Sequence, residues 1–418
     1  MPAVVLVLSK SGYQNDDFLA AARKLKLDVV TASDACHKLW EEWETDGVVW
    51  QAHQPAEAAA ELAAQVRDRA PSAIVGVDDR TALIASLASQ RLGLPHNPPE
   101  AMAAARSKEQ SRTRLRKAGL PVPRFQVLSL ADGDAAVDEA IASAPFPCVA
   151  KPVSLSASRG VIRADTREEL RAAIRRIAAL LRSPEVAQRR ETGLDRIIVE
   201  EFIPGQEIAL EGLLQNGELR VLALFDKPDP LDGPYFEESL YVTPSRHPRE
   251  LQLSVASAVS DGCRALGLVE GPVHAELRLS PQGPRILEIA ARSIGGLCGR
   301  ALRFGVGMTL EELVLRHALG MPPPPPREKV ASGVMMLPIP GRGVLQEVHG
   351  VDDARRLPLI EDVVVTAHLR EEVVPLPEGA SYFGFAFARG ETPAEVEAAL
   401  REAGARVRAV VAPRLFVT

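Results

Sequence analysis

Several residue types are scarce in this 418-residue sequence, and each shortage excludes a class of protein. The four cysteines (Cys36, Cys148, Cys263 and Cys298) show no CxxC spacing, so we expect reduced thiols and neither a disulfide framework nor a zinc site. Aromatic residues make up 4% and the net charge is −6, whereas proteins that bind nucleic acids or membrane surfaces usually carry a basic excess. No apolar run is long enough for a signal peptide or a membrane span. We therefore expect a cytoplasmic protein with neither nucleic-acid nor membrane partners.

The first hundred residues alternate short apolar runs with helical stretches. The predicted strands are 3–8, 28–31, 47–50 and 73–77, and the predicted helices are 55–69 and 80–91. Such alternation is typical of a parallel sheet flanked by helices. No GxGxxG follows the first run, although a dinucleotide enzyme needs those glycines to let the pyrophosphate approach the backbone. We predict a Rossmann-like α/β domain that is not a dehydrogenase.

The remaining chain predicts a multidomain protein of mixed α/β and α+β architecture. A helix predicted over 101–118 ends at Gly119, just before two prolines. The proline-rich run at 321–326 predicts a stiff spacer before a C-terminal α+β domain. Between them we expect strands at 124–128, 148–151, 161–164 and 196–202, and helices at 167–181, 251–266 and 310–319. The predicted domains are 1–100, 101–320 (a lid at about 121–200, then a second part at about 201–320) and 330–418.

The segment GPVHAELRLSPQGPRILEIAAR, residues 271–292, predicts a β-hairpin because a Pro-Gln-Gly turn separates two alternating runs. A ladder centred on Gln282 would place Glu276 opposite Glu288, and Leu277 opposite Leu287. Two facing glutamates repel each other unless a hard cation such as Mg²⁺ lies between them. The alternative is a solvated hairpin face that carries two unrelated glutamates.

The sequence LEIAARSIGG resembles the magnesium motif of the ATP-grasp ligases, in which a glutamate is followed by an asparagine and an arginine. Glu288 and Arg292 match this motif, whereas Ala290 stands at the asparagine position. An alanine pair before the arginine resembles the variant of the L-amino-acid (dipeptide) ligases. The resemblance implies that Glu276 and Glu288 hold magnesium, and that Arg292 binds the terminal phosphate or the acyl phosphate. For Arg292 the alternative is a surface salt bridge.

The segment IIVEEFIPGQEIALEG, residues 198–212, resembles the interdomain hinge of the same family. The resemblance implies that the backbone around Glu201–Ile203 contacts adenine and that Glu207 accepts hydrogen bonds from the ribose hydroxyls. A plain acidic hinge is the alternative. The nucleotide candidates of this segment are Glu200, Glu201, Phe202, Ile203 and Glu207.

Two lysines and a small-residue loop are further nucleotide candidates. Lys151 ends an apolar strand, where burial of an ammonium is unfavourable without an anion such as phosphate. The resemblance places Lys108 and Lys151 on the α- and β-phosphates, and it assigns a catalytic role to Lys151 as well as to Arg292. The loop SLSASRG stands where the family has a glycine-rich loop over the triphosphate, although only one glycine is present here. Solvated lysines and a plain lid hairpin are the alternatives; the loop candidates are Ser156, Ser158 and Gly160.

Substrate contacts are expected from the irregular insert 226–245 and from the hairpin. Glu237 and Glu238 would hold an amino-acid ammonium, and His274 is equally a substrate contact or a structural histidine of the sheet. The full set of substrate candidates is Glu237, Glu238, His274, Arg292, Gly295 and Gly296.

Three functions compete on this sequence. The family reaction forms an acyl phosphate from a carboxylate and ATP, and an amine then displaces phosphate. The first candidate is an L-amino-acid ligase that makes a dipeptide or related amide, with ADP and phosphate as products. The second is a bicarbonate-using enzyme of the biotin-carboxylase or purine-pathway type, and the third is a non-catalytic ATP-binding module. Ala290 favours the first. The resemblance implies small-molecule substrates, a homodimer, and ATP with two Mg²⁺ ions that Mn²⁺ can replace.

Overall fold

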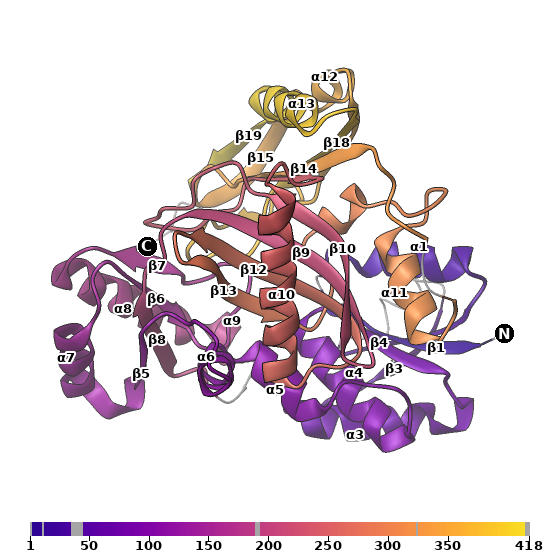
Figure 1. Cartoon of the computed structure of the whole chain (residues 1–418), viewed down its shortest axis with the longest axis horizontal. Coiled ribbons are helices and arrows are strands. Elements are labelled where there is room, and N and C mark those ends of the chain that lie inside the picture. Colours follow the sequence, from indigo (N-terminus) through magenta and orange to yellow (C-terminus); the bar gives the residue numbers. More distant parts are fainter. Residues whose placement is uncertain (1, 11, 35–44, 189–192, 323–324, 414–418) are drawn as a thin grey trace.

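The N-terminal region contains the parallel sheet that its alternating pattern predicts. The computed structural model describes residues 2–10, 12–34, 45–188, 193–322 and 325–413 (Figure 1), so Cys36 lies outside the described residues. The sheet has the order β3-β2-β1-β4 and all of its pairs are parallel. Its elements are β1 (Ala3–Val7), α1 (Asn15–Lys24), β2 (Asp28–Ser33), β3 (Asp46–Val49), α3 (Pro55–Val66), η1 (Arg67–Arg69), β4 (Ala73–Gly76) and α4 (Asp79–Leu92).

The predicted helix over 101–118 is wrong, because the chain forms α5 (Pro99–Arg106) and α6 (Lys108–Lys117) with a break at Ser107. Ser107 is extended, at φ −100° and ψ 113°, and its hydroxyl accepts a hydrogen bond from the Gln110 N–H. Serine favours such an N-cap position because its side chain satisfies a backbone donor that the first turn leaves unpaired. The break places Lys108 at the start of α6, where its backbone N–H donates to the carbonyl of Val153 at 3.1 Å.

A second sheet, of order β5-β8-β6-β7, forms the lid. Helix α8 has the predicted bounds and buries one apolar face against the strands. Helix α7 was not predicted, since it buries only Ala140 and Ile141 and so has little amphipathic pattern. The lid elements are β5 (Phe125–Ser129), η2 (Leu130–Asp132), α7 (Gly133–Ser143), β6 (Cys148–Pro152), β7 (Ile162–Ala164), α8 (Arg167–Leu181), α9 (Pro184–Ala187) and β8 (Arg196–Glu201).

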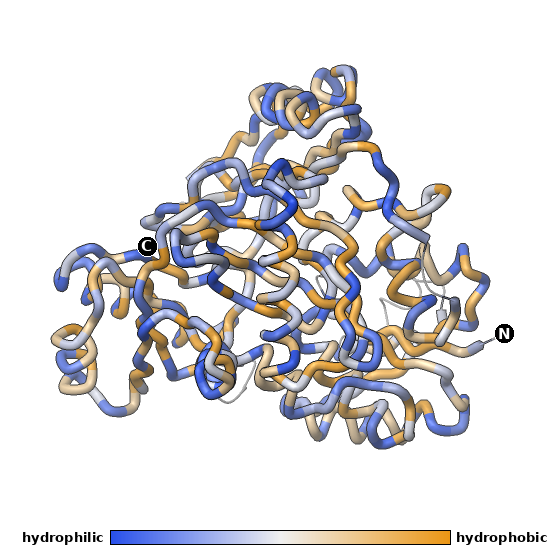
Figure 2. The backbone as a smooth tube through the Cα atoms, in the orientation of Figure 1, coloured by the Kyte–Doolittle hydropathy of each residue, from blue (hydrophilic) through white to orange (hydrophobic). Residues whose placement is uncertain are grey.

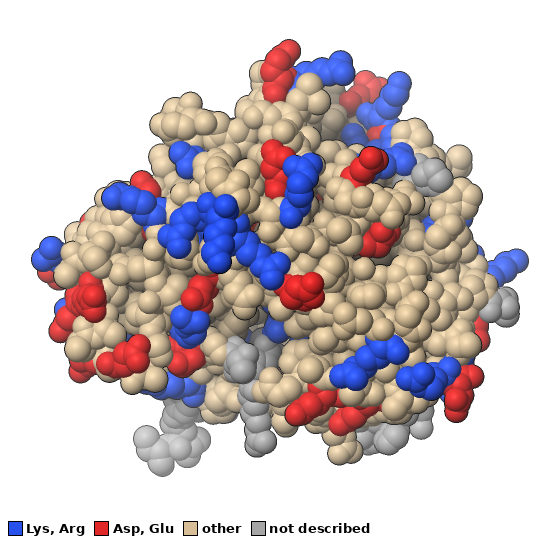
Figure 3. Space-filling model, turned by 60° about the horizontal axis from the view of Figure 1, so that its bottom comes forward, with Lys and Arg blue, Asp and Glu red and all other residues tan. Residues whose placement is uncertain are grey.

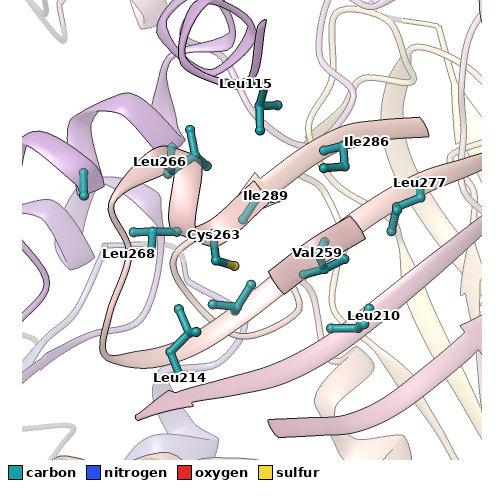
Figure 4. Packing of buried hydrophobic residues seen from close by; sticks show 14 of the residues in the cluster. Leu115, Leu210, Leu214, Val259, Cys263, Leu266, Leu268, Leu277, Ile286 and Ile289 are labelled. Atoms are coloured by element: carbon teal, nitrogen blue, oxygen red, sulfur yellow. The ribbon is translucent and has the colours of Figure 1, made fainter. Parts of the chain in front are cut away.

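The largest sheet has eight strands in the order β13-β12-β9-β10-β11-β14-β18-β16. Helices α5, α6 and α10 cover one face and enclose a core that includes Leu115, Val259 and Ile289 (Figure 4). The other face packs against η3 and α11. The elements are β9 (Gln206–Gln215), β10 (Glu218–Asp226), β11 (Leu240–Thr243), α10 (Arg249–Leu266), β12 (Gly271–Ser280), β13 (Gly283–Ala290), η3 (Cys298–Ala301), α11 (Leu310–Ala318), β14 (Ala331–Leu337), β16 (Ile360–Val365) and β18 (Gly384–Gly390).

The C-terminal strands β14, β16 and β18 continue this large sheet, so the chain beyond the proline run shares its backbone hydrogen bonding. The division into domains at about residues 100 and 330 stays a prediction. A small sheet and two helices complete the C-terminal region: β15 (Gly343–His349), α12 (Val351–Arg355), β17 (Glu372–Val373), α13 (Pro393–Arg406) and β19 (Arg408–Ala412).

Apolar residues concentrate along the interior strands, and polar ones along the outer turns and loops (Figure 2). On the face shown in Figure 3 the surface is mostly uncharged, with one contiguous group of basic side chains left of the centre and scattered charges of both signs around it. Cys148, Cys263 and Cys298 are buried and form no disulfide. Among the described residues, none of the helices combines the length and apolar character that crossing a bilayer requires.

Candidate active site

A cavity of about 410 Å³ lies where the N-terminal sheet, the lid, the large sheet and the C-terminal strands meet. It brings together most of the predicted site residues, whose roles stay predictions. Gly160 and Glu237 do not line it. The predicted residues in its wall are Lys108, Lys151, Ser156, Ser158, Glu200, Glu201, Phe202, Ile203, Glu207, Glu238, His274, Glu276, Glu288, Arg292, Gly295 and Gly296.

The β12–β13 hairpin places Glu276 opposite Glu288, as predicted. The predicted pair of Leu277 with Leu287 is wrong, because Leu277 pairs with Ile286. The turn holds only two residues, since Ser280 pairs with Gly283, and Leu287 is an extra residue that forms a β-bulge. An unbroken ladder with this turn would pair Glu276 with Leu287. The bulge therefore moves Glu288 opposite Glu276, so both carboxylates reach the cavity wall.

Lys151 also lines the cavity and belongs to a buried cluster of charges, whose Arg112 donates to the Leu287 carbonyl of the hairpin at 2.7 Å. Its ammonium is paired with Glu200, which also accepts from Arg112 at 3.0 Å and 3.2 Å. Burial would raise the pKa of Glu200, but Arg112 and Lys151 outweigh it and lower that pKa to about 2. Burial also lowers the pKa of Lys151, and the partial rise from Glu200 does not offset it. The Glu200 carboxylate thus binds two protein cations. It neutralises the buried Lys151 ammonium, for which we predicted a phosphate partner.

Lys108 lies beside this cluster and contributes to the lowered pKa of Lys151. Its ammonium donates to the carbonyl of Leu155 at 2.6 Å, at the base of the small-residue loop. The two predicted phosphate lysines therefore lie on the same side of the cavity, near Ser156 and Ser158.

The predicted contact of Gly160 with ATP is not supported by its position. Its N–H donates to the carbonyl of Pro377 at 2.7 Å, away from the cavity. The neighbouring Arg159 is buried, pairs with both carboxylate oxygens of Glu185 and donates to the carbonyl of Glu378 at 2.6 Å. Gly160 has a φ of +72°, and an added Cβ would contact the Pro152 ring at 2.8 Å. This glycine therefore serves the turn that docks the lid against the C-terminal region.

The hinge after β8 uses part of its backbone within the protein. The N–H groups of Glu201 and Phe202 donate to the carbonyls of Arg124 and Pro147, at 2.9 Å and 3.0 Å. Adenine recognition by this segment would have to use its remaining backbone groups. The Phe202 ring lies 4.2 Å from the guanidinium of Arg163.

A lysine that the sequence analysis missed occupies the centre of the predicted acidic residues. The ammonium of Lys227 lies 2.7 Å from Glu207 and 3.4 Å from Glu276, and it also pairs with Glu238. Glu238 in addition accepts from the Tyr241 hydroxyl at 2.6 Å. Glu238 thus pairs with a cation of the protein itself, and its contact with a substrate ammonium stays a prediction. Lys227 follows an apolar strand, which is the same signal that identified Lys151.

Glu207 is bound by a second cation, because Arg278 lies 3.3 Å from its carboxylate. The predicted hydrogen bonds from the ribose hydroxyls would therefore be accepted by a carboxylate that already binds two protein cations. Arg278 comes from β12 and is nearly fully buried. Sequence reasoning missed this residue, since its alternation with Glu276 looked like an ordinary polar strand face.

His274 is buried, and both of its ring nitrogens face carboxylates. Nδ1 lies 3.2 Å from Glu211, and Nε2 lies 3.5 Å from Glu276. Burial would lower the pKa of His274, but these two carboxylates raise it to about 9. Glu211 is itself fully buried and accepts from the Ile294 N–H at 3.1 Å. This bonding favours the structural alternative for His274, as a connection between the sheet and Glu276.

Arg292 forms an ion pair at the cavity wall, not on the outer surface. Its Nε lies 3.0 Å from Asp79, at the start of α4 in the N-terminal region, and its side chain is 14% exposed. Burial alone would lower its pKa, but Asp79 and Glu288 raise that pKa above its ordinary value. The neighbouring Gly296 has a φ of +61°, and an added Cβ would lie 3.1 Å from the Phe385 ring. Asp79 was not predicted, because its contact depends on how distant segments pack.

The far end of the cavity is lined by aromatic and sulfur-containing side chains from both ends of the chain. The Tyr13 hydroxyl accepts from the Tyr382 N–H at 3.2 Å and donates to the Tyr382 carbonyl at 3.3 Å. The rings of Tyr13 and Phe385 meet edge to face with centroids 5.3 Å apart. Met336 lies 3.6 Å from the sulfur of Cys298 in the same wall.

Two family models match the chain: an ATP-grasp domain over residues 144–301, and an L-amino acid ligase C-terminal domain 2 over residues 335–412. D-alanine–D-alanine ligase of Desulforudis audaxviator is 32% identical over 236 residues, which are 53% of this chain and 71% of that protein. Carnosine synthase 1 of Gallus gallus is 30% identical over 285 residues, or 65% of this chain. The matched part is only 30% of that longer protein.

The crystal structure of L-amino acid ligase from Bacillus licheniformis has the same fold, with a TM-score of 0.82 at 24% identity over 99% of both chains. The predicted ATP-grasp fold of mixed α/β content is confirmed by this similarity. The family is shown by the match to D-alanine–D-alanine ligase, of which 71% is covered, and by the ATP-grasp domain model. The chain belongs to the ATP-grasp family of ligases.

Proposed function

We propose that this chain joins a carboxylate to an amine at the expense of ATP, through an acyl phosphate, and that its substrates are L-amino acids. The observation that carries the proposal is the bulged hairpin, which places Glu276 opposite Glu288 beside Arg292. Opposed carboxylates and neighbouring cations in the wall of one cavity suit a metal-bound triphosphate.

The facing glutamates fit a magnesium site, since two carboxylates directly across a ladder destabilise it unless a cation neutralises them. Glu276 and Glu288 would hold Mg²⁺, which supplies neutralisation of the terminal phosphate. Because Ala290 replaces the usual amide ligand, water or phosphate oxygens would complete the coordination. The number of ions and replacement by Mn²⁺ stay predictions.

The remaining residues of the site position charge and do not form covalent intermediates. Lys108 and Lys151 would bind the phosphates, and Arg292 would orient the terminal phosphate and the acyl phosphate. Asp79 holds the Arg292 guanidinium in the cavity wall at 3.0 Å. This ion pair links the N-terminal region to the part of the cavity where the terminal phosphate would react.

The aromatic end of the cavity favours an amino acid with an apolar side chain. Tyr13, Met336 and Phe385 offer an apolar wall next to Gly295 and Gly296, and such walls gain stability when they remove apolar groups from water. The similarity to an L-amino acid ligase C-terminal domain supports this substrate class, because that domain supplies Met336 and Phe385.

Bicarbonate chemistry is the second candidate, and the non-catalytic module is the third. Ala290, at the position where carboxylating relatives would have asparagine, supports the amino-acid ligase over the bicarbonate enzyme. The opposed glutamates and Arg292 support catalysis over simple nucleotide binding. The homodimer and the cytoplasmic location also stay predictions.

The proposal is tested by following oxygen from the carboxylate substrate. A phosphate-release screen over the twenty amino acids, singly, in pairs and with bicarbonate, first identifies substrates. With an ¹⁸O-labelled carboxylate we expect one labelled oxygen in the released phosphate, with ADP as the other product. Label in AMP would show adenylation and would contradict the acyl-phosphate route. Release of phosphate with bicarbonate alone would favour the second candidate.

A further inference from the structure

Three carboxylates of the site lie close enough together to hold one cation. One oxygen from each of Glu207, Glu238 and Glu276 lies within 4.8 Å of the others. The ammonium of Lys227 contacts all three carboxylates, from the end of β10. Its side chain is 3% exposed, and its charged end also lies 4.9 Å from the Tyr241 ring.

The charges of this group shift the pKa values of its members. Burial alone would lower the pKa of Lys227, but Glu207, Glu238 and Glu276 raise it well above its ordinary value. Burial raises the pKa of Glu238 to about 7, with contributions from the neighbouring glutamates. For Glu276 the effect of burial is outweighed by Lys227 and His274, which lower its pKa well below the ordinary value.

We propose that Lys227 is a built-in cation that fills the position among Glu207, Glu238 and Glu276, and so restricts divalent metal to Glu276 and Glu288. The contacts support a positioning role. One side of Glu276 is held by Lys227 at 3.4 Å and by His274 at 3.5 Å, and across the ladder it meets Glu288. The inference rests on the magnesium assignment of the proposed function.

The consequence is a metal site that is latent in the wild-type chain. Without the ammonium, three carboxylates would remain within 4.8 Å of one another in a largely buried position. Oxygen ligands gathered in this way suit Mg²⁺ or Mn²⁺. Glu276 would then bridge two ions, one with Glu207 and Glu238 and one with Glu288.

The test counts Mn²⁺ bound to nucleotide-free protein, from the loss of the free-ion signal in electron paramagnetic resonance. We expect Lys227→Met to bind one more equivalent of Mn²⁺ per chain than the wild type. We also expect Mn²⁺ to raise its melting temperature more than that of the wild type. The matched control is Lys24→Met, which removes an exposed lysine paired with Glu312 at 2.7 Å and should leave the count unchanged. An equal count in folded Lys227→Met and in wild type would overturn the proposal.

If Lys227→Met does not fold, a second variant, Glu238→Gln, tests whether Lys227 keeps metal away from the three carboxylates. In the otherwise wild-type chain, Glu238→Gln should keep the wild-type count, because Lys227 already excludes metal from Glu238. A lower count in Glu238→Gln would mean that this carboxylate binds metal beside the lysine, and the proposal would be wrong. Glu288→Gln tests the magnesium assignment separately from the role of Lys227. If Glu288→Gln binds as much Mn²⁺ as the wild type, the assignment of magnesium to Glu276 and Glu288 is wrong. The comparison of Lys227→Met with the wild type still tests the role of Lys227.

Discussion

Lys151 and Lys227 are both buried lysines at the ends of apolar strands, yet their surroundings carry opposite charge. Lys151 shares the single carboxylate of Glu200 with Arg112, and Lys108 lies nearby. Lys227 meets three carboxylates. The pKa of Lys151 is lowered, chiefly by burial, whereas the pKa of Lys227 is raised because its carboxylates outweigh burial.

The comparison shows that burial alone does not identify a phosphate-binding lysine. Around Lys151 the cations outnumber the anions, so a triphosphate would complete the charge balance. Around Lys227 the carboxylates of Glu207, Glu238 and Glu276 already balance the cations Lys227, Arg278 and His274, so no cation is left over for a phosphate. The local charge count therefore distinguishes a lysine that binds ligand from one that holds the protein's own carboxylates in place.

The largest expected effect is on stability, from Lys227→Met. Removing one member of a buried ion cluster leaves uncompensated charge, and we expect a loss of about 3–5 kcal/mol in the free energy of unfolding, measured with urea in EDTA. The exposed pair of Arg406 with Glu402 gives the control, for which Arg406→Met should lose only about 0–1 kcal/mol. Similar losses of unfolding free energy in the two variants would show that the buried cluster contributes no more than an exposed ion pair.

Acid should weaken the Lys151 cluster through Glu200. The folded-state pKa of Glu200 is lowered from 4.5 to about 2 by Arg112 and Lys151, against the effect of burial. The contribution of ionised Glu200 to the free energy of unfolding is therefore fully present above pH 4.5 and is lost as the pH falls toward 2. This contribution amounts to about 3 kcal/mol. Urea unfolding of wild type and Glu200→Gln between pH 6 and 3 measures this. Parallel loss of stability in both proteins would contradict the shifted pKa.

Nucleotide affinity should depend on Lys151, with a smaller free-energy change. Lys151→Met removes a charge-assisted bond to phosphate worth roughly 1.5–3 kcal/mol, which is a 10- to 150-fold weaker affinity for ATP by titration calorimetry. The fold should persist because Arg112 still neutralises Glu200. Lys117→Met changes an exposed lysine of α6 and serves as control. Unchanged ATP affinity in Lys151→Met would show that this lysine does not bind phosphate and has only a structural role.

Much of the fold could be predicted because apolar periodicity acts locally. The parallel strands of the first hundred residues and the bounds of α8 followed from patterns within single segments. The break at Ser107 could not be predicted with the same rules, since the carbonyl of Val153, which accepts from the Lys108 N–H after the break, comes from another part of the chain. The joining of β14, β16 and β18 to the large sheet is likewise a long-range pairing.

The site shows the same limit. The sequence pattern predicted that Glu276 and Glu288 face each other, but with an unbroken ladder and a longer turn, whereas the bulge at Leu287 creates the pairing. The contacts of Lys227 and Arg292 with distant acids required the packed structure. The ion pair of Glu238 with Lys227 required it as well, and the substrate role of Glu238 stays a prediction.

The smallest expected effect concerns the lid, which carries Lys151 but not Lys227. Glu378 pairs with Arg176 of α8, with one contact at 2.9 Å, and both side chains are partly exposed, at 31% and 43%. Exposed pairs contribute about 0.2–1 kcal/mol and are screened by salt. Glu378→Gln should therefore raise the KM for ATP by roughly 1.5- to 5-fold at low salt and less at high salt.

The matched control is Glu402→Gln, which breaks the exposed pair of Glu402 with Arg406 on α13, at 2.6 Å, without contact to the lid. Because Glu378 holds only the lid, its substitution should leave the Mn²⁺ count unchanged, while Lys227→Met should change it. If Glu378→Gln altered metal binding as much as ATP affinity, the two lysine clusters would be coupled. The two lysine clusters would then belong to one connected site, in which the position of the lid affects metal binding as well as phosphate binding.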